Sequence, residues 1–519
     1  MVLQAPCQAC GRLFDPAVLA AATAHAFWRR PGGACPACVQ QTLLTELLTG
    51  GEKFFARSVQ DVWPLDAEAA FGALPIPLRL RADPRFNGRG VTIAIADSGF
   101  TPHPDLSQPT NRIAAWVDAS QSPQTVIRFG PEQQPHWPGA TEARDHQWHG
   151  TMTSVVAAGN GYRSNGLYRS LAPDARVVLL SLTDADGRIT DQSILRALNW
   201  VETNAAEFGI RVLSLSVAAD QPSIPMLGPI ERSVERLHDL GITVVAAAGN
   251  DGERRLVPPA TAPTAITVGG LDDRNTIDAD AATIWHSNFG HSATGIPKPE
   301  LVAPSLWVAA PILVGSALAK EAGELFARRA HDPSVEARLR DLKLVTPHYQ
   351  HVDGTSFAAP IVAATVAALL EANSRLTPPL IKELLVRTAS PVAGVGPERQ
   401  GAGALNAGRA TALALVEEHR WSERAPVTPI ITVAGPVFQI HDHSAKQVDV
   451  FGSWDDWDAP VPGRIVEPGL WTTRPVSLGA GEYQYKFKTD GQTWVADPTN
   501  PWRAGDGVGG LNSWFTWPA

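Results

Sequence analysis

The sequence predicts an α/β protein whose central domain holds a parallel β-sheet flanked by helices. Five short apolar runs rich in β-branched residues alternate with helix-like stretches such as Asp191–Phe208 and residues 230–240; the runs are VTIAIAD, ARVVLLSL, RVLSLSV, ITVVAAAG and AITVGGL. Strands that are apolar on both faces and alternate with helices are typical of a buried parallel sheet. Two further observations predict a separate module at each end. All four cysteines lie before residue 40, and eight of the 16 tryptophans lie in the last 99 residues.

The length of 519 residues and a hydrophobic content of 44% indicate several globular domains. We expect a cysteine-bearing module over residues 1–50, a connector over 51–85 and the α/β domain over 86–415. That domain contains an insertion at about 316–347, where Leu and Ala recur at helical spacing. A proline-containing linker over 416–430 then leads to a small all-β sandwich over 431–519, where residues alternate in VDVFGSW and EYQYKFKTD.

Composition argues against two classes of protein. A formal net charge of -9 disfavours nucleic-acid binding as the main activity. No apolar run reaches the roughly 18 residues of a membrane span, since the longest, residues 357–370, is shorter. The first residues, MVLQAPCQACGRLF, lack the basic and apolar regions of a secretory signal, so we expect a cytoplasmic protein.

The cysteines form two Cys-x-x-Cys pairs, Cys7 with Cys10 and Cys35 with Cys38. Each pair presents two thiolates from one tight turn, and zinc prefers four such ligands in a tetrahedron. The alternatives are two disulfides or four thiols without a ligand role. We expect a structural zinc ion, which also favours a reducing compartment. A nucleic-acid-binding role for this module is a weaker alternative, based on the arginines Arg12, Arg29 and Arg30.

Three motifs predict nucleophilic catalysis by a serine. Asp97-Ser98-Gly99 directly follows a predicted strand, His149-Gly150-Thr151 begins a predicted helix, and Ser356 lies in GTSFAAP at the start of another. A serine hydroxyl needs a base to take its proton, and the base needs a carboxylate to orient it. Asn250, at the end of AAGN after a fourth strand, could donate a hydrogen bond to a developing oxyanion.

These motifs, in the order Asp, His, Ser, resemble the subtilisin-like serine peptidases over about residues 86–415. DSGFTPHPDL, HGTMTS, VLSLSVA, VVAAAGNDG, PELVAPS and GTSFAAPIVAA carry the resemblance. It implies a subtilisin-like fold, with Asp97 as orienter, His149 as base, Ser356 as nucleophile and Asn250 as oxyanion donor. The backbone N–H of Ser356 would be the second oxyanion donor.

The resemblance also implies where a peptide substrate would bind. The strand over residues 213–218 would pair with the substrate backbone, and an alanine stands at the family's usual glycine position in it. The added methyl group of this alanine should narrow the pocket entrance, and residues 247–249, AAG, should line another wall of the pocket. Both features favour an apolar P1 residue. The expected substrate-binding residues are Ser214, Ser216, Ala218, Ala248 and Gly249.

The chain departs from the family at two points. The connector is too short for the folding prodomain of secreted subtilases. Residues 74–80, LPIPLRL, resemble the short inhibitory extension of some intracellular members, but the sequence favours the alternative, a plain linker. Residues 159–169, where subtilisins commonly hold calcium, contain no acidic residue. Ca²⁺ usually needs carboxylates, so the sequence does not predict calcium there and leaves it open elsewhere.

The C-terminal segment resembles the glycogen-binding sandwich of AMP-activated kinase β subunits and starch-branching enzymes. The matching pieces are GSWDDWD, GEYQYKFKTDGQTW, ADPTNP and GGLNS. The resemblance implies Trp457 and Trp494 as stacking platforms for sugar rings, with Lys486 and Asn512 as polar contacts. Docking of a protein partner is the alternative, since many members of this fold have lost sugar binding.

The sequence as a whole therefore predicts a cytoplasmic serine endopeptidase that acts on proteins or peptides and is regulated or targeted by its flanking modules. The alternative is a catalytically silent scaffold that binds an α-glucan or a protein partner.

Overall fold

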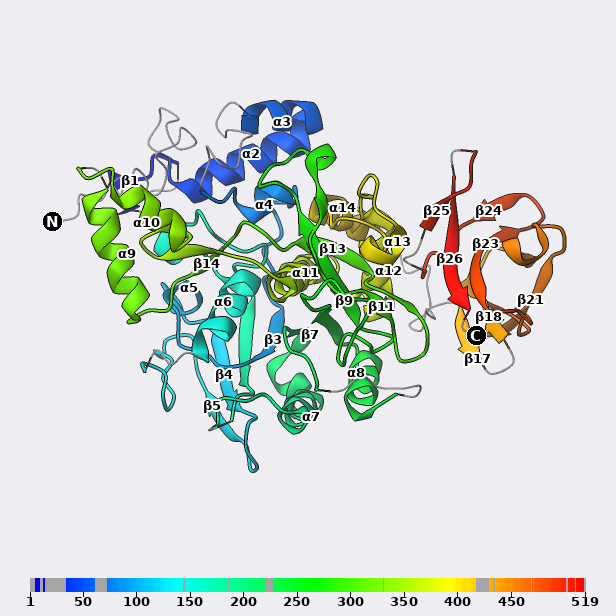
Figure 1. Cartoon of the computed structure of the whole chain (residues 1–519), viewed down its shortest axis with the longest axis horizontal. Coiled ribbons are helices and arrows are strands. Elements are labelled where there is room, and N and C mark those ends of the chain that lie inside the picture. Colours follow the sequence, from blue (N-terminus) through cyan, green and yellow to red (C-terminus); the bar gives the residue numbers. More distant parts are fainter. Residues whose placement is uncertain are drawn as a thin grey trace.

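The computed structural model describes residues 5–9, 13–14, 34–60, 72–142, 146–184, 186–220, 227–329, 331–416, 429–432, 435–467, 469–500, 503–508 and 510–517. Figure 1 shows a large α/β body, with the helices α2 (Pro36–Gly50) and α3 (Glu52–Gln60) along one side and a β-rich C-terminal body on another.

The α/β body is built on a nine-stranded, mostly parallel sheet, which confirms the predicted fold class. The strands run in the order β10-β9-β8-β7-β3-β6-β4-β5, and β13 also pairs with β9. Only the pairings of β5 with β4 and of β10 with β9 are antiparallel. Their bounds are β3 (Thr92–Asp97), β4 (Ile113–Asp118), β5 (Thr125–Arg128), β6 (Arg176–Ser181), β7 (Ile210–Leu215), β8 (Thr243–Ala247), β9 (Ile266–Asp272), β10 (Thr283–Ile284) and β13 (Leu301–Pro304).

Helices cover both faces of this sheet because the strands are apolar on both faces. Alternate residues of β3 show this: Ile93 and Ile95 belong to one core with α6 (Gln147–Ala158) and α11 (Thr355–Ala372). Ala94 and Ala96 belong to the opposite core with α7 (Asp191–Phe208) and α8 (Pro229–Asp239). The helices α12 (Pro378–Thr388) and α14 (Ala407–Val416) add to the first core.

Local capping signals explain where α7 begins and ends. The Thr190 hydroxyl accepts from the Ser193 N–H while the Ser193 hydroxyl accepts from the Thr190 N–H, which satisfies two donors at the helix start. The helix stops at Gly209, whose backbone is left-handed. Its bounds agree with the predicted stretch.

The helix α11 is the center of the first core. Among the described residues it is the one helix long and apolar enough to cross a membrane, with a mean hydropathy of 1.6. Since 83% of that stretch is buried inside the domain, its apolar character is accounted for by packing against the sheet.

The insertion folds as a compact unit beside this core. It contains the helices α9 (Ala317–Arg328) and α10 (Val335–Asp341), which share a small apolar cluster with Ile312 and Leu344. A three-stranded sheet of β14 (Val308–Pro311), β16 (Tyr349–Val352) and β15 (Leu344–Thr346) connects this unit to α11.

The N-terminal helices are packed against the α/β body. Leu43, Leu44 and Phe55 form an apolar cluster with Leu74, Leu78 and Ile277. Arg79, at the end of α4 (Ile76–Arg79), makes a buried ion pair of 2.5 Å with Asp273. Residues 74–80 are therefore an integral part of the folded domain, which differs from the plain linker that the sequence favours.

The C-terminal region is all-β in its described strands, as predicted, and these strands pair in antiparallel fashion. Its main strands run in the order β19-β22-β21-β20-β23-β26-β25, and β24 pairs with β23. The ring of Phe438, beside β19, lies 4.5 Å from Tyr485 of β23 and 5.7 Å from Phe515 of β26, so the sheet folds over one apolar core. The strand bounds are β17 (Ile430–Thr432), β18 (Gly435–Val437), β19 (Gln439–His441), β20 (Val448–Gly452), β21 (Val461–Glu467), β22 (Leu470–Thr473), β23 (Gly481–Thr489), β24 (Thr493–Val495), β25 (Arg503–Gly505) and β26 (Leu511–Trp517).

Candidate functional site

The structure brings Asp97 and His149 into direct contact. Asp97 ends β3 and is fully buried, and His149 lies in the first turn of α6. The distance from His149 Nδ1 to Asp97 Oδ1 is 2.7 Å. Gly150 permits this approach, since a Cβ at that position would collide with the carbonyl oxygen of Gly99.

Further hydrogen bonds fix the Asp97 carboxylate. The Ser98 N–H donates to Oδ1 over 2.6 Å, and the Thr153 hydroxyl donates to Oδ2 over 2.8 Å. Burial lowers the pKa of His149, but the charge of Asp97 and its hydrogen bond raise it more, so the net pKa is above the ordinary value. This carboxylate therefore orients the imidazole and stabilises its protonated form.

Ser356 lies at the start of α11, and the residue that follows it contacts the imidazole. It is the second residue of that helix, and the ring of the following residue, Phe357, lies 5.8 Å from the ring of His149. The first N–H groups of a helix have no partner within the helix and carry partial positive charge. The Ser356 N–H belongs to this set, so its position suits an oxyanion.

Asn250 is held at the same helix start. Its Oδ1 accepts from the N–H of Thr355 over 3.0 Å and from the Thr355 hydroxyl over 2.8 Å. These two bonds fix the orientation of the amide group. The amide oxygen accepts both of them, and the Nδ2 group is the end that can donate to another molecule.

Asn250 and Ser356 both line a cavity of about 280 Å³. Four of the five expected substrate-binding residues line it: Ser216, Ala218, Ala248 and Gly249. The fifth, Ser214, does not. It lies in the middle of β7, paired with Ile95 and Val245, and is 1% exposed. The strand β7 ends at Leu215, so the segment from Ser216 onward borders the cavity without sheet pairing.

Sequence reasoning missed the polar part of this cavity. Asp251, Arg255 and Asn288 also line it. Asn288 Oδ1 accepts from the N–H groups of Asp251 and Glu253, which shapes the loop after Asn250. Asp251 could have been suspected from its place beside Asn250, whereas Asn288 has no local motif. The wall is therefore mixed in polarity, beside the apolar surface that the sequence predicts.

Three cysteines meet at the N-terminus of α2. The Sγ atoms of Cys7, Cys35 and Cys38 lie within 4.8 Å of one another, and Cys10 lies outside the described residues. The Cys7 and Cys38 sulfurs are 3.8 Å apart, far longer than the roughly 2.05 Å of a disulfide. Sulfurs around a tetrahedral zinc ion, each at about 2.3 Å from it, lie roughly 3.8 Å apart. The cluster therefore fits a metal ion held by thiolates.

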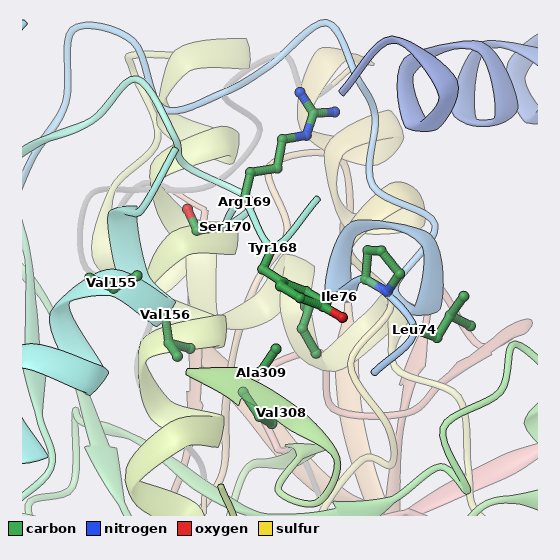
Figure 2. Close-up of a pocket in the computed structure, with 10 residues that line it drawn as sticks. Leu74, Ile76, Val155, Val156, Tyr168, Arg169, Ser170, Val308 and Ala309 are labelled. Carbon is green, nitrogen blue, oxygen red and sulfur yellow. The ribbon is translucent and has the colours of Figure 1, made fainter. Parts of the chain in front are cut away.

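Residues 159–169, where subtilisins commonly hold calcium, are held by hydrogen bonds to other parts of the protein. The fully buried carboxylate of Asp105 accepts from the Arg163 N–H over 2.9 Å and from the Tyr349 hydroxyl. Tyr349 belongs to β16, the strand that follows the insertion, so this strand contacts the loop. Residues 74–76 line a separate cavity with Tyr168 and Val308, which shares no residue with the one at Ser356 (Figure 2).

Two of the four predicted sugar contacts form an aromatic pair on the C-terminal region. The rings of Trp457 and Trp494 lie 6.4 Å apart at 74°, and Trp494 is 45% exposed. The two polar residues have intramolecular partners. Lys486 Nζ lies 2.6 Å from Asp506, and Asn512 Nδ2 donates to Gln484 over 2.7 Å.

An α/β domain with an Asp–His pair beside a serine at a helix start, in a cavity with an amide donor, has the arrangement of a serine hydrolase. Comparison with known proteins agrees. The profile of the subtilase family matches residues 88–407, and the chain belongs to this family. The profile of the glycogen recognition site of AMP-activated protein kinase matches residues 436–516.

Individual relatives align over the same domain. The chain is 30% identical over 329 residues to serine protease AprX of Bacillus subtilis (strain 168), covering 62% of this chain and 66% of that protein. It is 26% identical over 325 residues to Subtilisin BL of Lederbergia lenta, covering 62% and 91%. Among solved structures, the self-cleaved protease domain of PatA matches with a TM-score of 0.42 and 22% identity, covering 63% of this chain and 97% of that one.

Proposed function

We propose that this chain is a serine endopeptidase that hydrolyses protein or peptide substrates, with Asp97, His149 and Ser356 as its triad. The observation that carries the proposal is the 2.7 Å contact between His149 and Asp97 beside the start of α11, where Ser356 opens onto a cavity. The reducing conditions that thiolate ligands need favour action in the cytoplasm.

The mechanism follows from these groups. His149 takes the proton of the Ser356 hydroxyl, and Ser356 Oγ attacks the peptide carbonyl carbon. Asn250 Nδ2 and the Ser356 N–H donate to the resulting oxyanion. His149 then passes its proton to the leaving amine. Water, deprotonated by His149, hydrolyses the acyl-enzyme and regenerates the serine.

Active-site labelling with a fluorophosphonate probe, together with cleavage of unfolded casein, tests this function. Wild-type protein should be labelled and should cleave casein, while Ser356→Ala should do neither. Absence of both activities from folded wild-type protein would favour the alternative of a silent scaffold.

The rate should depend on pH through His149. Because the base must be deprotonated and its pKa is raised, kcat/KM should increase with pH through a pKa above the ordinary histidine value of about 6.5. Asp97→Asn should move this acidic limb to lower pH and reduce kcat roughly 10⁴-fold. The measurement is kcat/KM on a fluorogenic peptide from about pH 5 to pH 9. A wild-type limb at or below the ordinary value would contradict the role given to Asp97.

We also propose that the cysteine cluster holds zinc and that the C-terminal region binds α-glucan. The thiolate set is one that zinc prefers, and the Trp457–Trp494 pair offers exposed aromatic faces to sugar rings. Lys486 and Asn512 would have to exchange their present partners to contact a sugar. These two modules would place the peptidase near selected targets.

Trp494→Ala should weaken retention on amylose. Loss of a central aromatic contact costs about 2 kcal/mol, or about 30-fold in Kd. Trp148→Ala is the matched control, because Trp148 is similarly exposed, at 44%, and lies in the peptidase domain. The glucan proposal fails if wild-type protein stays in the supernatant or if both variants lose retention equally.

A further inference from the structure

The cysteine cluster is packed against residues 159–170, which directly follow the helix α6. The helix α6 carries His149 and ends at Ala158, and residues 159–170 continue from it. This segment is tied to the last turn of α6, because the Gly159 N–H donates to Val155 O over 2.7 Å and the Ser170 N–H donates to Gly159 O over 2.8 Å. A displacement of the segment would therefore reach α6.

Gln40 connects α2 to this segment. Its side chain is fully buried, and Nε2 donates to the carbonyl oxygens of Gly166 over 3.0 Å and Leu167 over 2.8 Å. Buried carbonyl groups that lose their donors are costly to the folded state. Gln40 lies two residues after Cys38 in α2. The position of the cysteine-bearing turn therefore determines whether the Gln40 amide reaches the two carbonyl groups.

The turn from Cys35 to Cys38 also contacts residues 159–170 directly. A Cβ on Gly166 would lie 2.6 Å from the Cβ of Ala37, which stands between Cys35 and Cys38. Gly166 has a φ of +82°, so glycine suits this position for two reasons. The two chain segments are therefore in close contact at the metal-binding turn.

Charge complements this contact. Arg169 lies near Cys35 and Cys38: burial lowers the pKa of its guanidinium, while the negative charges of Asp174 and of the two thiolates oppose that effect. In Figure 2, Tyr168 points into the cavity and the guanidinium of Arg169 points away from it. A divalent ion held by four thiolates would keep a net negative charge, which this arginine would balance in part.

We propose that a metal ion in the cysteine cluster fastens residues 159–170 through Gln40 and thereby holds α6 and His149 in place. Metal occupancy would then control the peptidase reversibly, with Gln40 as a positioning residue. The activity readout of this inference rests on the proposed peptidase function, but the fastening itself does not.

The test uses full-length protein reconstituted with Zn²⁺ alone, and compares wild type, Gln40→Ala and Gln41→Ala. Gln41 is the matched control, since it is the next residue and is exposed. Hydrogen exchange is followed in peptides covering residues 155–170 before and after zinc is removed with a chelator under reducing conditions. Zinc content and kcat and KM are measured on the same samples.

We expect zinc removal to accelerate exchange in residues 155–170 by at least about tenfold, with little change in the β7 and β8 strands. Gln40→Ala should keep its zinc yet show the same local acceleration, and kcat should fall while KM stays constant. Gln41→Ala should behave as wild type. Readdition of Zn²⁺ should restore wild type and leave Gln40→Ala unchanged.

Three results would overturn the inference: protein that binds no zinc, exchange that is unchanged when zinc leaves, or acceleration that is equal throughout the domain. If wild type lacks peptidase activity, the exchange and zinc data still decide the fastening, and only the proposed function fails.

Discussion

Ser356→Ala should remove peptidase activity while leaving the fold intact. The hydroxyl is the proposed nucleophile, and alanine, a good helix former, should keep the helical start of α11. In subtilisin, a member of the same family, loss of the nucleophile lowers kcat about 10⁶-fold. We expect a loss of similar order here, measured as kcat on a fluorogenic peptide.

The control for this loss is Ser444→Ala. Ser444 is an exposed serine of the C-terminal region, and its hydroxyl donates to Asp442. It should retain full activity. Substantial cleavage by purified Ser356→Ala would contradict the assignment of the nucleophile. Equal thermal unfolding temperatures of wild type and Ser356→Ala would show that the loss is chemical.

Glu300→Gln should produce the largest loss of stability. The carboxylate of Glu300 is fully buried, and its Oε1 lies 2.6 Å from Nζ of both Lys298 and Lys382. Its Oε2 accepts from the Thr267 N–H over 2.7 Å. Removing the negative charge takes the nearest counterion from two buried ammonium groups and leaves Glu235 as the remaining carboxylate that interacts with them. Breaking a buried ion pair in this way costs about 3–5 kcal/mol. Urea unfolding measures this difference.

A matched control separates burial from the ion pair itself. Glu52 makes a contact of 2.8 Å with Arg81, but its side chain is 54% exposed. Glu52→Gln should cost less than about 1 kcal/mol, as exposed pairs usually do. A second replacement, Lys382→Met on the Glu300→Gln background, should recover part of the loss. Equal effects of the two Glu→Gln variants would contradict the argument.

The pH dependence of stability should follow from the same cluster. Burial lowers the pKa of Lys298 to about 7, although the charge of Glu300 opposes this. The unfolded chain therefore binds this proton more tightly than the folded protein does. The contribution of Lys298 to stability should increase as pH rises from about 7 toward the ordinary lysine value of about 10.4.

Local sequence signals were sufficient for the sheet, its flanking helices and the positions of Asp97, His149, Ser356 and Asn250. Each follows from a pattern of a few residues, such as the apolar run before Asp97 or the small residues around Ser356. The topology also limits where strand-end residues can lie, because the ends of parallel strands meet at one edge.

Contacts between distant segments could not be predicted in this way. Gln40 has no motif that connects it to Gly166, and Lys298 and Lys382 look like surface residues in the sequence although both are buried. The sequence pattern places Ser214 in a strand but does not show where that strand ends. In the structure β7 continues to Leu215, so Ser214 is buried within the sheet and the cavity lining begins only at Ser216. Intramolecular partners of Lys486 and Asn512 likewise depend on the paired strands.

The order of the site along the chain has a consequence during synthesis. Asp97 and His149 emerge from the ribosome early, whereas Ser356 arrives only with α11, which packs against the centre of a sheet that must already exist. Contacts of such high sequence separation form late in folding, because the entropy of closing a long loop must be overcome first. A nascent or truncated chain therefore lacks a working nucleophile. Peptidase activity should therefore appear only after the whole α/β domain has folded.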